Sequence, residues 1–162
     1  MSNAASNDLR KKYEIAFANI RGILDIFPED KWLKPHGDEY YIPCRIAYHL
    51  AVFINGIIGG GFKDPDFAAK LPYGNWLEAT SETLPDKKTF IAYFDDSVKI
   101  ATEALAAITD DSLLIPFEPD NVRFGATPVG MHLQFMRELS DHTGELNKML
   151  IENGLDDVWL AR

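Results

Sequence analysis

Glu138 and His142 lie four residues apart in the segment 130–153, where apolar residues recur at three- and four-residue steps. This periodicity predicts a helix with one buried face. Residues four apart on a helix lie one above the other, about 6 Å apart at Cβ, so the carboxylate and the imidazole point the same way. Such a pair can bind a metal ion. Among apolar residues it must be paired or coordinated, because an unpaired buried charge costs several kcal/mol.

A second imidazole interrupts the apolar stripe of another segment, 41–58. His49 occupies a position where the helical period formed by Ile42, Ile46, Phe53 and Ile57 requires an apolar residue. Two imidazoles and one carboxylate converging from two helices form a ligand set for Zn²⁺, Ni²⁺, Fe²⁺ or Mn²⁺. Such a set leaves coordination positions open for water or a small-molecule substrate, which suits catalysis.

Two charged residues lie close to these candidates in the sequence. Glu145, three residues after His142, either orients an imidazole through a hydrogen bond or is a surface charge. Arg45, one turn before His49, either binds an anionic group of the substrate or is exposed to solvent. An ion pair between Glu138 and an arginine such as Arg45 is the alternative that would leave no metal site.

The remaining histidines and the single cysteine give weaker signals. His132 lies about 120° around the helix from Glu138, so we expect it to be structural or exposed. His36, between Pro35 and Gly37, is expected in a solvent-exposed loop. Cys44 cannot form an internal disulfide, and no neighbouring pattern indicates a reactive thiolate, so it is expected in the core.

Periodicity and capping residues predict four long helices. The first runs from a cap at Asn7 or Asp8 to Phe27, and the others cover 41–58, 86–108 and 127–153. Pro128 is expected in the first turn of the last helix, after a Thr127 cap. No strand is predicted with confidence, so the fold class is all-α, a four-helix bundle with long connections.

The longest connection, 59–85, is expected to be either a lid or pocket wall, or a plain surface loop. Tyr73 and Trp76 lie within it. These two aromatic residues either line a pocket or anchor the loop.

Composition limits the classes of function. The 162 residues suit one domain, and a formal net charge of −9 repels nucleic acid. No apolar run is long enough to cross a membrane, and one unpaired cysteine suits a reducing compartment, so we expect a cytoplasmic protein. Residues 1–6 are interpreted as a disordered cloning remnant, with one domain over 7–162.

At the candidate ligands the chain resembles the DinB/YfiT-like family of metal-dependent enzymes. IPCRIAYHLAVF, from 42 to 53, resembles the family's second helix, with His49 as its first metal histidine. MRELSDHTGELNKMLIENGLDDVWL, from 136 to 160, resembles the last helix, with His142 as the second histidine of the ligand pair. Glu138 stands where the family usually has the first histidine of that pair. The carboxylate favours harder ions such as Fe²⁺ or Mn²⁺, and zinc is compatible with the same set.

The resemblance implies a DinB/YfiT-like four-helix bundle that pairs as a homodimer. Characterised relatives include bacillithiol transferases and a mycothiol-dependent maleylpyruvate isomerase. The resemblance therefore implies thiol transfer with a low-molecular-weight thiol cosubstrate, or hydrolysis as a close variant. In either reaction the metal would lower the pKa of a thiol or of water.

A different class of protein accounts for the same residues. In a non-catalytic, stress-linked binding or interaction module, His49, Glu138 and His142 would form a hydrogen-bonded network in the core. Such a protein would bind no metal tightly. Metal binding therefore separates the two hypotheses.

Overall fold

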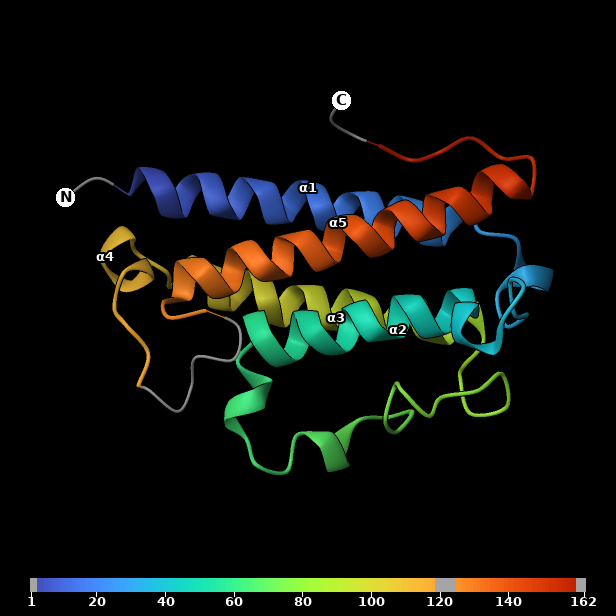
Figure 1. Cartoon of the computed structure of the whole chain (residues 1–162), viewed down its shortest axis with the longest axis horizontal. Coiled ribbons are helices and arrows are strands. Elements are labelled where there is room, and N and C mark those ends of the chain that lie inside the picture. The colour runs from blue at the N-terminus through green and yellow to red at the C-terminus, as the bar shows by residue number, and fades with distance from the viewer. Residues whose placement is uncertain (1–2, 119–124, 160–162) are drawn as a thin grey trace.

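A computed structural model describes residues 3–118 and 125–159 of the chain. No strand occurs within these ranges, so the expected all-α class is confirmed there. Figure 1 shows the long helices lying side by side along the longest axis of the molecule. The helices are α1 (Ala4–Ile26), α2 (Pro43–Phe53), α3 (Lys87–Ala106), the short α4 (Asp110–Leu113) and α5 (Pro128–Glu152).

The core lies between the four long helices. Helix α1 packs against α3 and α5, and α2 packs against the same two helices. Each long helix therefore has two neighbours and buries a wide arc of its surface. The core is rich in fully buried aromatic side chains, which include Tyr13, Trp32, Tyr48, Phe90, Phe94 and Phe135.

The predicted start signals of α3 and α5 are confirmed. The Asp86 side chain accepts a hydrogen bond from the backbone N–H of Thr89 at 2.8 Å, which caps α3. The Thr127 hydroxyl accepts one from the backbone N–H of Gly130 at 3.4 Å, and Pro128 occupies the first turn of α5. Both caps satisfy backbone donors that have no partner within the helix. They fix where α5 begins, and with it the direction in which Glu138 and His142 point.

Helix α1 begins earlier than the predicted cap at Asn7 or Asp8, so that prediction is wrong. Helix α1 begins at Ala4, and Ser6 is fully buried. The Asp110 carboxylate accepts hydrogen bonds from the backbone N–H groups of Ser6 at 2.8 Å and of Ala5 at 3.3 Å. A side chain more than 100 residues away thus supplies the cap, and no local pattern could reveal it. Residues 1 and 2 lie outside the described range.

Helix α2 continues into a π-helical turn, Ile54–Ile58, so the helical segment ends where the sequence predicts. A Cβ atom on Gly56 would lie 2.6 Å from the tip of the Phe62 ring, so this ring packs directly against the backbone of the turn. That loop contains two short 3₁₀ turns and runs beneath α2 in Figure 1. The long connection is therefore packed against the helix that carries His49.

Within the described ranges, no helix combines the length and the apolar character needed to cross a membrane.

Candidate metal centre

Three predicted ligands from two adjacent helices meet in the structure. His49 on α2 and Glu138 and His142 on α5 each offer one ligand atom, and these atoms all lie within 4.8 Å of one another. His142 Nε2 is 3.9 Å from Glu138 Oε2, and the two imidazole rings lie 4.7 Å apart at 83°. Atoms bound to one ion at about 2.1 Å lie about 3–4 Å from each other. A small inward movement would therefore complete a coordination set.

His49 is held in an apolar environment. It is 6% exposed, and its ring lies 4.5 Å from the Phe53 ring and 4.0 Å from the Trp76 ring. Burial, together with the nearby His142, lowers the pKa of His49 to about 3. The imidazole is therefore neutral at physiological pH, which is the form that binds a metal.

The two oxygens of Glu138 have different surroundings. Oε1 accepts hydrogen bonds from Gln134 Nε2 at 2.9 Å and from the Arg137 guanidinium at 2.8 Å. Oε2 is the oxygen that faces His142. The hydrogen bonds to Oε1 orient the carboxylate and leave Oε2 directed toward the imidazole.

Glu145 contacts the nitrogen of His142 that faces away from Glu138. The Glu145 carboxylate accepts a hydrogen bond from His142 Nδ1 at 2.7 Å. Because a carboxylate accepts, this bond places a proton on Nδ1, and Nε2 is the ring nitrogen that faces Glu138. A carboxylate in this position fixes the ring orientation and raises the basicity of a metal-binding histidine.

We expect Glu145→Ala to weaken zinc binding by about 10- to 100-fold, the usual cost of losing such a partner. Competition against a coloured chelator measures the affinity. Glu152→Ala is the matched control, because Glu152 lies on the same helix and pairs with His36 instead. An unchanged affinity in Glu145→Ala would show that the hydrogen bond to His142 has no part in metal binding.

Arg45 holds the long loop against α2. Its guanidinium donates hydrogen bonds to the backbone carbonyls of Trp76, Leu77 and Glu39, and it lies 5.0 Å from the centre of the Tyr40 ring. It makes no ion pair with Glu138, which pairs with Arg137 instead. A role for Arg45 in binding substrate stays a prediction.

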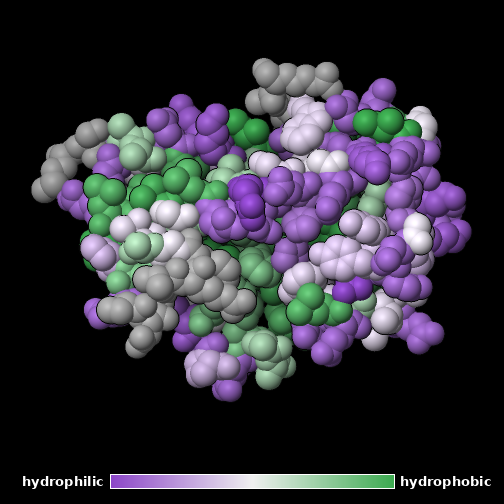
Figure 2. All heavy atoms as spheres, in the orientation of Figure 1, coloured by the Kyte–Doolittle hydropathy of each residue, from purple (hydrophilic) through white to green (hydrophobic). Residues whose placement is uncertain are grey.

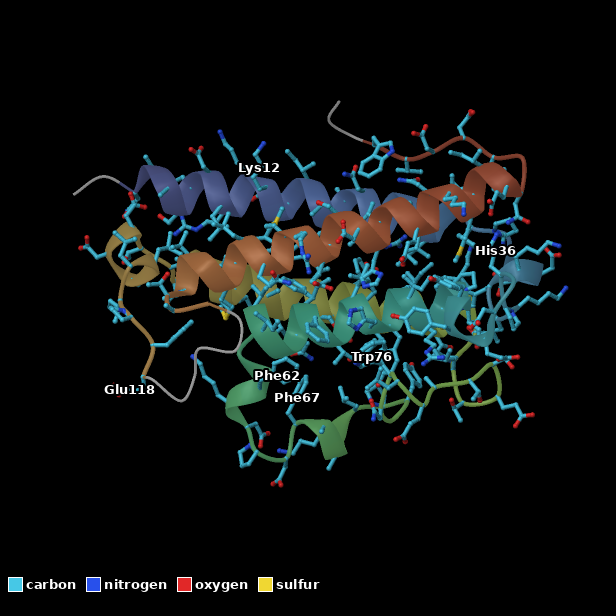
Figure 3. All side chains as sticks on the ribbon, viewed as in Figure 1. Lys12, His36, Phe62, Phe67, Trp76 and Glu118 are labelled. Atoms are coloured by element: carbon cyan, nitrogen blue, oxygen red, sulfur yellow. The ribbon has the colours of Figure 1, made fainter. Side chains whose placement is uncertain are left out.

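Trp76 both anchors the loop and forms a wall of the metal centre. In Figure 3 it lies between the loop and α2. Together with Tyr40, Arg45 and Ile46 it covers one side of His49 and His142 and leaves no room there for a water molecule. A ligand must therefore approach the two histidines from another side.

A cavity of about 170 Å³ adjoins the opposite side of the centre. Glu138 and Gln134 form its polar end, and its other lining residues are Phe53, Ile57, Met131 and Phe135. Phe53 lines this cavity and contacts His49, whereas neither His49 nor His142 lines the cavity itself. A small molecule in this cavity would lie beside Glu138.

Comparisons with known families, proteins and structures identify no relative of this chain. No protein-family model matches the chain, and searches of curated proteins and of solved structures also give no match. The chemistry is therefore inferred from the site itself, and membership of the DinB/YfiT-like family stays a prediction.

His132, expected to be structural or exposed, is structural. It is 3% exposed, and its Nδ1 atom lies 3.0 Å from the Tyr13 hydroxyl of α1. Helix α5 packs against α1 as well as α2, so the face 120° away from Glu138 is also buried. Burial lowers the pKa of His132 to about 4 and raises the pKa of Tyr13. Both groups are therefore neutral at physiological pH.

The low pKa of His132 predicts a loss of stability in mild acid. Below its ordinary pKa of 6.5 the unfolded chain binds a proton that the folded chain does not bind until about pH 4. The free energy of unfolding therefore decreases as the pH is lowered through this window. At pH 5 this residue alone lowers it by about 2 kcal/mol. In His132→Asn, which keeps an acceptor for Tyr13, we expect the loss between pH 7 and pH 5 to shrink by about that amount. Urea unfolding at the two pH values measures the loss of stability in both proteins. An equal loss in His132→Asn and in the unaltered chain would contradict the burial of a neutral His132.

The other two weak candidates lie away from the centre. His36 is exposed, as expected, and its Nε2 atom contacts the Glu152 carboxylate. Cys44 is fully buried, its thiol lies 3.7 Å from the Pro85 carbonyl, and burial raises its pKa. The thiol therefore stays protonated in the core, and neither residue contributes to the metal centre.

Proposed function

We propose that this chain is a metal-dependent enzyme of the DinB/YfiT-like four-helix-bundle type, with a divalent transition metal held by His49, Glu138 and His142. One observation carries the proposal: three ligand atoms from two helices lie within 4.8 Å of one another in a partly buried site. The Glu145 hydrogen bond to the outer nitrogen of His142 supports it, since metal-bound histidines commonly have such a partner.

The contacts within the trio favour a metal over a structural hydrogen-bonded network. His49 Nδ1 is buried and has no hydrogen-bond partner among the described residues. The 3.9 Å between His142 Nε2 and Glu138 Oε2 is too long for a hydrogen bond. A structural network would use these atoms, because buried polar groups that serve the fold are normally hydrogen-bonded.

The residues around the centre have separate roles in this proposal. When bound, the ion would lower the pKa of a coordinated thiol or water and so supply a nucleophile at neutral pH. Glu145 orients His142, and Trp76 and Phe53 exclude water from His49. Substrate enters from the side of Glu138. The proposed reaction is transfer of a low-molecular-weight thiol to a small electrophile, with hydrolysis as the close variant.

A metal-dependent turnover assay tests the function. Protein loaded with Zn²⁺, Mn²⁺, Ni²⁺ or, without oxygen, Fe²⁺ is mixed with a low-molecular-weight thiol and a chromogenic electrophile, and in parallel with a nitrophenyl ester. We expect turnover that needs the ion and disappears in His142→Ala. Turnover that is the same in metal-free protein and in His142→Ala would contradict the proposed chemistry.

A further inference from the structure

Two cavities adjoin each other on the Glu138 side of the metal centre. The smaller, of about 170 Å³, ends at Glu138, and the larger has a volume of about 450 Å³. Ile57 of the π-helical turn and Met131 of α5 line both cavities. These shared walls place the two spaces next to each other. The larger one alone falls within the size range of small-molecule sites.

The larger cavity is mostly apolar. Its walls include Phe62, Ile108 and Phe117. In Figure 3, Phe62 lies beneath the end of α2, and Figure 2 shows apolar residues reaching the surface together where this end of α2 meets the loop.

Two ionisable side chains also line the larger cavity. Lys63 is exposed, and His132 is uncharged because burial lowers its pKa to about 4. The cavity therefore presents one positive charge and two uncharged polar side chains, Ser112 and His132, among mostly apolar walls. That surface disfavours cationic ligands and admits neutral or singly anionic ones.

We propose that the two cavities form one binding channel for the substrate of the metal centre, and that this substrate is an elongated, neutral or singly anionic molecule with an unbranched apolar chain. The reactive end would lie beside Glu138 and the chain would extend past Ile57 and Met131 into the larger cavity. This inference rests on the proposed function. The approach past Trp76 and Arg45 has no room for a water molecule, which directs the substrate into the channel.

The channel predicts that affinity rises with chain length. Burying one methylene group contributes roughly 0.8 kcal/mol, which is about fourfold in affinity. Alkyl hydroxamates are suitable probes, because the hydroxamate group binds zinc and the alkyl chain can be lengthened one carbon at a time. Binding of the series from acetohydroxamate to octanohydroxamate is measured by calorimetry, in zinc-loaded and in metal-free protein.

Bulky substitutions at the shared walls locate the chain. Ile57→Trp and Met131→Trp should narrow the junction of the two cavities, and both positions are partly exposed, so the folded chain can accommodate the larger side chains. Leu133→Trp is the matched control, since Leu133 is 67% exposed on the same helix and lines neither cavity. We expect the two wall variants to lose the dependence on chain length, whereas Leu133→Trp keeps it.

The outcomes separate the channel from the metal centre. Zinc-dependent binding of acetohydroxamate without any gain from longer chains would overturn the channel and leave the metal centre standing. A gain with chain length, in a series whose members all bind equally well with and without zinc, would support the channel and contradict the metal centre. A gain that survives in both wall variants would overturn the proposed position of the chain.

Discussion

Zinc affinity is expected to fall by more than 100-fold when either His49 or His142 is replaced by alanine. Each substitution removes one of three protein ligands, so its effect should exceed the roughly 10- to 100-fold cost of losing a hydrogen-bond partner of a ligand. The two imidazoles come from different helices and contact one ion only if α2 and α5 hold them together. Loss of binding in both variants would therefore link the ion to the packing of these helices.

A chelator competition assay measures this loss, with His36→Ala as the control. His36 is also a histidine, but it lies in a loop and pairs with Glu152 at the end of α5. Its variant should bind zinc as tightly as the unaltered chain. Equal affinity in His49→Ala and His36→Ala would exclude His49 as a ligand.

Phe135→Ala is expected to lower the free energy of unfolding by about 3–5 kcal/mol. Phe135 is 1% exposed and lies between the metal centre and the His132–Tyr13 contact on the face of α5. Its ring stacks at 6.1 Å on Phe53 and lies 6.4 Å from Tyr13, so it joins α5 to both α2 and α1. Removing the ring leaves a cavity where three helices meet. Since a domain is typically stable by only about 5–15 kcal/mol, the loss should be large.

Urea unfolding of the metal-free chain measures the cost of Phe135→Ala without any contribution from a bound ion. Leu133→Ala, two residues away and 67% exposed, should change stability by about 0.5 kcal/mol or less. A loss below about 1 kcal/mol in Phe135→Ala would show that this ring does not join the three helices as the structure places it.

The elements that carry the ligands follow from local patterns. The apolar period around Glu138 and His142 predicts the buried face of α5, and Thr127 and Pro128 predict its start. His49 stands out because it interrupts the stripe of α2. These features depend on residues within a few turns of one helix, which is the range over which hydrophobic period and capping act.

Other features depend on contacts between distant segments, so the sequence left them open between alternatives or did not reveal them. Trp76 covers His49 because Arg45 holds its loop against α2. His132 is buried because α5 packs against two helices. The apolar period of α5 predicted a single buried face, and His132 lies outside that face. Residues 4–6 are helical because Asp110 caps them from another part of the chain. Loop paths and packing partners are set by tertiary contacts, which local patterns do not encode.

The central claim is that one divalent ion binds between α2 and α5. The measurement that tests it most directly is elemental analysis of protein without a histidine tag, after incubation with Zn²⁺, Ni²⁺, Mn²⁺ and, without oxygen, Fe²⁺ and removal of the free ion by gel filtration. We expect one equivalent of at least one ion per chain, absent from His49→Ala and His142→Ala. If the unaltered chain retains none of the four ions, then His49, Glu138 and His142 belong to the fold and the catalytic proposal is wrong.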